Sequence, residues 1–246
     1  MVAAGSNLQQ LWTEAIAKLE ADNPVLEELL NQSLASLEEN GGVNLPDEVF
    51  SWVTGEYALA LLPSPNGKEQ NWLFVTEKTE ETEEAIANLD SLAKQQGLSV
   101  GSLLWDDQEI TAWTKLVTTA QASQRQNEVR LNARVSGVHT GIGKYEIFTN
   151  SLTNLEQALA PQGNSLLASE KFSEVLATLP KENNGYFYVD WPKTEPLLTQ
   201  QVPIFRVLEF PVQPLFNHLR SLTLSGNGSQ NGVSRATLFL QLEAEN

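Results

Sequence analysis

The sequence predicts an α+β protein in which antiparallel sheet carries helices packed on one face. Two observations predict this class. Some stretches have apolar residues three and four positions apart, a pattern that is typical of amphipathic helices. They alternate with short stretches that have the two-residue period of strands. The strands follow one another across tight turns, without the regular strand–helix–strand units that build a parallel sheet.

The helical period begins at the N-terminus, over residues 8–22 and 24–40. The tripeptide Asp-Asn-Pro separates the two stretches, and proline is favoured at the first position of a helix. We expect the apolar residues of the second helix to form a buried stripe: Val25, Leu26, Leu29, Leu30, Leu34 and Leu37. Further helices are predicted over residues 79–96, 151–161 and 169–180, and the first of these has the acidic first turns that suit a helix dipole.

Strands are predicted where the period falls to two or where a short apolar run ends at Gly or Pro. They cover residues 56–63, 71–77, 99–117 (two strands around a turn at 106–108), 129–140, 144–150 and 186–191, and a long hairpin over 217–243. The polar stretch 118–128 is interpreted as a loop.

We interpret residues 1–246 as a single α+β region. An alternative remains open, in which two pseudo-repeated parts of the fold pack tightly, with a boundary near residues 118–128. A weak internal echo supports it. A helix with Phe50 and Trp52 leads through Gly55 into a strand, and a helix with Phe172 leads through Gly185 into another.

Composition restricts the functional classes. The 31 acidic and 15 basic residues give a formal net charge of −16, so binding to nucleic acid or to anionic lipid is not expected. A partner with a basic surface would suit this charge. With no cysteine, the chain has no disulfide, thiolate metal site or cysteine nucleophile, and no apolar run is long enough to span a bilayer.

The stretch SGVHTGIGKY, residues 136–145, resembles a phosphate-binding loop at first sight. A Walker A loop needs a glycine separated from Gly-Lys by four residues, a following Ser or Thr, and then a helix. Val138 and Tyr145 occupy the first and last of these positions, and a strand pattern follows. We therefore interpret the stretch as a hairpin turn.

Candidate site residues are few. His139 and His218 are the two histidines, and without cysteine neither suggests zinc; His139 remains a possible base for a carboxylate enzyme. No cofactor, metal or catalytic site is assigned. The residues Trp105, Asp106, Asp107 and Trp113 surround a predicted turn, and because tryptophan is frequent at binding hot spots they are the candidate interaction patch.

Three strings, PDEVFSWVTGEYALALLP, VSGVHTGIGKYEIFTNSLTNLEQAL and SLLASEKFSEVLATLPKENNGYFYVDW, resemble the cyanobacterial domain of unknown function 3352 family, and the similarity runs from about Leu8 to Glu243. The resemblance implies that this chain is the C-terminal portion of a longer protein, anchored to a membrane only through a segment outside this chain. It also implies an extracytoplasmic location, in the periplasm or the thylakoid lumen. It carries over no reaction, cofactor or catalytic residue.

Together these observations favour a non-catalytic protein-binding or scaffold module. Two alternatives remain open. A carboxylate-based hydrolase would need a deep pocket with converging acidic side chains. A carrier of a small molecule or lipid would need an enclosed apolar cavity of roughly several hundred Å³.

Overall fold

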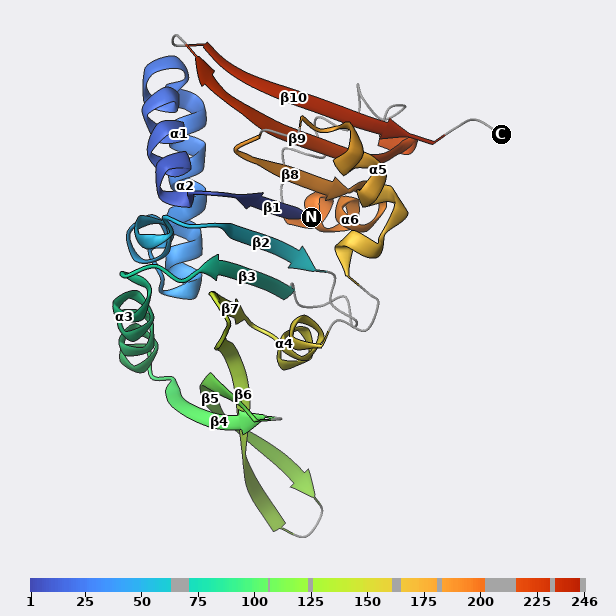
Figure 1. Ribbon diagram of the computed structural model, residues 1–246. Helices are drawn as coiled ribbons and strands as arrows, with labels where there is room; N and C mark the ends of the chain where they lie inside the picture. Colours follow the sequence, from blue (N-terminus) through green and yellow to red (C-terminus); the bar gives the residue numbers. More distant parts are fainter. Residues whose placement is uncertain are drawn as a thin grey trace. The chain divides into compact units, whose positions relative to one another are not determined.

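Helices and strands are described for residues 1–62, 71–105, 107–123, 126–160, 165–180, 183–201, 216–230 and 233–243 in a computed structural model of the chain. The described strand pairings are antiparallel and the sheets carry helices, which confirms the α+β class (Figure 1). The chain divides into two units built from segments that are distant in the sequence. Unit 1 comprises Met1–Gly5, Ala58–Trp72 and Gln157–Asn246, and unit 2 comprises Ser6–Tyr57 and Leu73–Glu156.

The strands of unit 1 follow the order β10, β9, β8, β1, β2. Their bounds are β1 Val2–Gly5, β2 Tyr57–Leu62, β8 Gly185–Asp190, β9 Leu219–Gln230 and β10 Val233–Leu242. The helices are η3 Leu166–Ala168, α5 Glu170–Thr178 and α6 Trp191–Gln201. Side chains alternate between the two faces of a strand, so one face of β8 presents Tyr188 to α5, where it packs with Phe172 and Val175. On the opposite face Phe187 and Leu224 are cross-strand partners, and both are exposed.

The strands of unit 2 follow the order β3, β7, β6, β5, β4. Their bounds are β3 Asn71–Glu77, β4 Ser99–Trp105, β5 Gln108–Ser123, β6 Gln126–Ile142 and β7 Tyr145–Thr149. The helices are α1 Leu8–Asp22, α2 Pro24–Gly41, the short η1 Leu45–Val49 and η2 Phe50–Trp52, α3 Thr82–Gln95, and α4 Leu152–Leu159, which begins in this unit. Helix α3 buries one face, whose residues are spaced three or four positions apart: Thr82, Ala85, Leu89 and Ala93.

The helices expected at the N-terminus are confirmed as α1 and α2, and Asn23 caps the second by accepting from the backbone N–H of Leu26. The buried stripe expected on α2 is wrong: Val25 is 70% exposed and Leu29 is 47% exposed. A helical period shows that apolar residues share a face, but it does not show that another element covers that face.

The loop expected over residues 118–128 is also wrong, because β5 and β6 continue through 118–123 and 126–128 as a paired ribbon. Cross-strand hydrogen bonds satisfy the backbone of such a ribbon whatever the polarity of its side chains. A domain boundary near 118–128 stays a prediction. The closing hairpin is confirmed, with β9 extending further into the polar turn than expected. Among the described residues, no helix combines the length and apolar character required to cross a bilayer.

Candidate functional site

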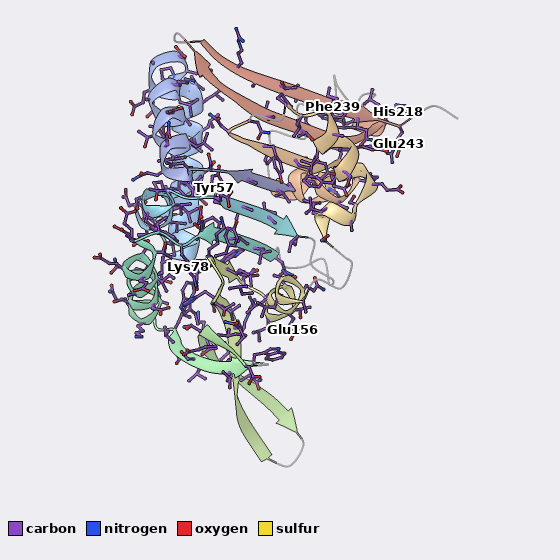
Figure 2. All side chains as sticks on the ribbon, viewed as in Figure 1. Tyr57, Lys78, Glu156, His218, Phe239 and Glu243 are labelled. Carbon is purple, nitrogen blue, oxygen red and sulfur yellow. The ribbon has the colours of Figure 1, made fainter. Side chains whose placement is uncertain are left out.

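His139 lies on β6 in the core of unit 2, and its residue is only 6% exposed. Its ring stacks on Phe148 of the neighbouring strand, with centroids 5.3 Å apart, and Trp113 of β5 packs against it at 5.7 Å. The two aromatic side chains hold the imidazole in place and exclude water from it. His139 is therefore buried, in contrast to His218, which is exposed and lies just before β9 near Glu243 (Figure 2).

Both ring nitrogens of His139 face carboxylates. Nδ1 lies 3.0 Å from Oε1 of Glu146 on β7, and Nε2 lies 3.3 Å from Oδ1 of Asp90 on α3. The indole N–H of Trp113 donates to the same Asp90 oxygen at 2.6 Å. Nζ of Lys78, which follows β3, lies 3.6 Å from the other oxygen of Glu146. These side chains form a polar network that links α3 to three strands.

This network limits the chemistry available to His139. A general base needs a ring nitrogen that is free to take a proton from a substrate, and both nitrogens already lie within hydrogen-bond distance of a carboxylate. The hydroxyl of the adjacent Thr140 donates elsewhere, to the backbone oxygen of Glu109 at 2.6 Å. The arrangement is that of a buried clamp between elements rather than that of a nucleophile and its base.

The glycine-rich stretch forms the turn between β6 and β7, in which Ile142 pairs with Tyr145 and Gly143 has a φ of 52°. This confirms the hairpin turn. Glycine takes a positive φ without the steric cost that a Cβ brings, which explains the residue at position 143.

Beside this turn lies an exposed ionic cluster. Nζ of Lys144 donates to Oε2 of Glu56 at 3.2 Å and to Oε1 of Glu77 at 3.0 Å. The hydroxyl of Tyr145 donates to Glu56 at 2.6 Å and, together with Lys144, lowers the pKa of that carboxyl. The backbone N–H of Glu56 donates to Glu77 and lowers its pKa, and Lys144 adds to the effect. These carboxylates, mainly that of Glu77, raise the pKa of Lys144.

A pocket of about 400 Å³ opens in unit 2 between η1–η2 and α3. Four carboxylates line it: Asp47, Glu48, Glu81 and Glu84. Trp52 forms part of its wall, fixed by an indole N–H that donates to the backbone oxygen of Glu48 at 2.8 Å. Leu89 and Leu92 contribute apolar surface, and no described residue that lines the pocket is basic.

The helical period of α3 explains how its side chains reach the pocket. Glu81, Glu84 and Asn88 follow one another at intervals of three and four, so they share a face of the helix. Asp90 lies on the same helix and contacts His139. One element therefore provides both a wall of the pocket and a partner of the buried histidine.

The structure does not bring the members of the predicted patch together. Trp105 is 39% exposed, and Asp107 is exposed with a φ of 64°, whereas Asp106 lies outside the described residues. Trp105 pairs with Gln108, and Trp113 pairs with Val100, five positions from Trp105. Because faces alternate along a strand, the two tryptophans point to opposite faces. The indole N–H of Trp113 donates to Asp90, and a binding role for the four residues of the patch stays a prediction.

The pocket was missed from sequence, although each part of it left a signal. The pattern of residues 46–53 predicts a short amphipathic turn or helix, and the acidic first turns of the helix over 79–96 are typical of a helix face in solvent. The first segment and the helix are separated by two strands, so no local pattern places them side by side. Within the described part of the chain, no group of three or more His, Asp or Glu side chains could hold a metal ion.

Comparison with known proteins gives one result. A family model with the description "Protein of unknown function (DUF3352)" matches residues 1–242, which is nearly the whole chain. No curated protein and no solved structure matches the chain.

Proposed function

This chain belongs to the DUF3352 family, and from that premise we propose that it is a non-catalytic binding module whose acidic pocket holds basic side chains of a partner protein. One observation carries the proposal: four carboxylates gather around a pocket of about 400 Å³ that none of its described lining residues neutralises.

The chemistry of the pocket suits lysine or arginine. Carboxylates of Asp47, Glu81 and Glu84 can accept charge-assisted hydrogen bonds, and the indole of Trp52 provides a flat apolar wall for the stem of a long side chain. The net charge of −16 adds long-range attraction for a basic partner, which raises the rate of encounter more than the affinity.

The two alternatives draw less support. Acidic residues line the pocket, which favours a carboxylate hydrolase, but Glu81 and Glu84 are exposed. A carboxyl that acts as general acid needs an apolar environment. His139 offers no free nitrogen to such a site. A carrier of apolar molecules would need an enclosed apolar cavity, and this pocket has four carboxylates at its wall.

The proposal includes a location. The family resemblance supports an extracytoplasmic protein of cyanobacteria, in the periplasm or thylakoid lumen, held at the membrane through a segment outside this chain. Fractionation of cyanobacterial cells that express the full-length tagged protein tests this. Recovery of the tag from the cytoplasm alone would contradict it.

Binding of two labelled peptides tests the pocket. One has three arginines separated by glycines, and the other has asparagine in place of each arginine. We expect the arginine peptide to bind at low salt and to bind more weakly as salt rises, because contacts between exposed charges are screened. Glu81→Gln with Glu84→Gln should weaken binding by about tenfold, equivalent to about 1.4 kcal/mol.

The matched control is Glu20→Gln with Glu156→Gln, which removes the same charge from exposed positions that do not line the pocket. We expect this variant to bind like the parent protein. Equal weakening in the two variants would mean that net charge alone attracts the peptide, and the pocket would lose its role.

A further inference from the structure

Strand β10 forms an edge of the sheet in unit 1. Among the strands that the structure describes, it pairs with β9 alone, over Val233–Leu242, and β8, β1 and β2 follow further in (Figure 1). An edge strand presents backbone N–H and C=O groups with which a further strand can pair. The outer side of β10 is therefore a place where another extended segment can join the sheet.

Strand β10 is regular, although its pairing with β9 is interrupted twice. The register shifts between Ser234 and Ala236, and it shifts again between Gln241 and Leu242. At each shift β9 advances by one residue more than β10, so the extra residue belongs to the inner strand. A bulge in the edge strand itself is a common protection against pairing with another chain, and both of these bulges lie in β9 instead.

The two faces of β10 differ. Phe239 packs against the core cluster beneath α5, so the odd-numbered residues share the face that carries this helix. The even-numbered residues share the opposite face, and three of them are exposed leucines: Leu238 at 59%, Leu240 at 39% and Leu242 at 47%. A strand that pairs with this edge would bring its own side chains against the row of leucines.

Two charged residues lie near opposite ends of this strand. Arg235 is on β10, and Glu243 follows its last residue, with a backbone N–H that donates to the backbone oxygen of His218 at 2.7 Å (Figure 2). Both side chains are exposed, and neither forms an ion pair with another described residue. An even number of positions separates them, so they lie on the same face of the strand.

We propose that β10 pairs antiparallel with β10 of a second copy of this chain, about a two-fold axis at Phe239. This register sets Arg235 of each copy opposite Glu243 of the other, so the symmetric dimer contains the ion pair twice. Because residues 233–243 contain no other charged side chain, no other antiparallel register of the two strands sets opposite charges opposite each other. The inference goes beyond the proposed function and does not depend on the pocket.

The same register brings the two rows of leucines together. Leu238 of one copy lies opposite Leu240 of the other, and Ala236 lies opposite Leu242. Directly opposite side chains of an antiparallel pair have Cβ atoms about 4.5–5.5 Å apart, so the leucines contact each other across the axis and lose exposed surface. The register that pairs the charges therefore also pairs the apolar residues, as a self-complementary interface requires.

Charge reversal tests this register by sedimentation velocity. At 0.15 M salt a Debye length of about 8 Å limits the repulsion between two chains of charge −16, and we expect the parent protein to dimerise. Arg235→Glu and Glu243→Arg should each raise the dissociation constant by about tenfold, because two ion pairs become two like-charge contacts. An equimolar mixture of these variants, and the double variant by itself, should dimerise like the parent protein, because both restore opposite charges across the pair.

Three outcomes would overturn the proposal: a parent protein that stays monomeric at submillimolar concentration, single variants that dimerise like the parent, or a mixture as weak as its components. Lys94→Glu is the matched control, because it changes the net charge as Arg235→Glu does but lies exposed on α3. It should dimerise like the parent protein, and equal weakening would mean that net charge alone governs association. Urea unfolding checks that each variant keeps its fold.

Cross-linking tests the register independently of charge. The chain has no cysteine, so an introduced cysteine is its only thiol. A mixture of Leu238→Cys and Leu240→Cys should form a disulfide-linked dimer under mild oxidation, because the two positions lie opposite each other in the proposed pair. A mixture of Leu224→Cys and Leu240→Cys is the control, since Leu224 is exposed on the inner strand β9. Equal cross-linking in the two mixtures, or none in the first, would refute the register.

The arginine-peptide assay separates this inference from the proposed function. The pocket lining includes none of the substituted positions of β10, so Arg235→Glu should bind the peptide as the parent protein does. A protein that binds the peptide and never dimerises would keep the proposed function and refute the dimer. A dimer that does not bind the peptide would keep the dimer and refute the proposed function.

Discussion

At the scale of single residues, His139 combines burial with polar contacts on both of its ring nitrogens. Each ring nitrogen lies within hydrogen-bond distance of a carboxylate, that of Glu146 or that of Asp90. Nζ of Lys78 lies 3.6 Å from the other oxygen of Glu146. Removing one partner of a buried hydrogen bond is destabilising, because the polar group that remains is left unsatisfied.

We therefore predict that His139→Phe, which keeps an aromatic ring between Trp113 and Phe148, lowers the free energy of unfolding by about 1–3 kcal/mol. Urea unfolding followed by circular dichroism measures the change. His218→Gln is the control, since an exposed histidine should change stability by no more than about 0.5 kcal/mol. Equal stabilities of the two variants would show that the contacts of His139 carry no net energy.

The second prediction at this scale concerns Glu56, whose pKa the Tyr145 hydroxyl lowers. A carboxyl with a lower pKa in the folded state contributes stability above its unfolded pKa, near 4.3, and loses it as pH falls through the folded value. In Tyr145→Phe the pKa of Glu56 should rise toward the ordinary value, and the loss of stability on acidification should be smaller.

Carbon-detected NMR titration of the glutamate carboxyls, with urea unfolding between about pH 3 and 6, checks both statements. Tyr186→Phe is the control, because it removes a tyrosine hydroxyl in unit 1, away from Glu56 in the sequence and in another unit. An unchanged Glu56 titration in Tyr145→Phe would mean that Lys144 alone sets the pKa.

Single residues differ in how far the sequence predicted them. The turn at Gly143 was predictable, because the requirement for a positive φ is local and glycine meets it. The contact of His139 with Asp90 was not, because 49 positions separate them and the pairing depends on how α3 packs on the sheet.

At the scale of elements, close packing between neighbouring strands fixes Trp113. It pairs with Gly137 of β6, and a Cβ added at Gly137 would lie 2.6 Å from Cε3 of the indole. A β-bulge follows at Thr114. Glycine at position 137 therefore makes room for the ring that reaches Asp90.

We predict that Gly137→Ala displaces the indole and costs about 1–3 kcal/mol of stability, as is usual when extra atoms enter a packed core. Near-ultraviolet circular dichroism should report the moved tryptophan, and urea unfolding should report the energy. Gly101→Ala on β4 is the control, because a Cβ there would meet no atom within 4 Å. Similar effects of the two substitutions would contradict this account of Gly137.

The sequence predicted the helices and strands better than it predicted which of their side chains are buried. The α2 and α3 helices and the closing hairpin were all recognisable, because periodicity and caps are local properties. The exposed apolar face of α2 and the continuation of β5 through residues 118–123 were not. Both depend on what lies beside the element, which its own residues do not encode.

At the scale of the whole molecule, the decisive quantity is charge and where it lies. A net charge of −16 resists association, so any contact between two copies needs local complementarity to overcome a general repulsion. Composition alone therefore predicts only a partner with a basic surface, and the proposed function adds the pocket as the place where that partner binds.

The sequence by itself determined the α+β class, most of the helices and strands, the acidic charge and the family membership. These properties depend on composition and on patterns within about 20 residues. Only the tertiary structure decided that Asp47 lies across a pocket from Glu84, and that Asp90 and Glu146 enclose His139. Such sites arise when packing joins elements that are distant in the chain, and local periodicity contains no information about which elements will meet.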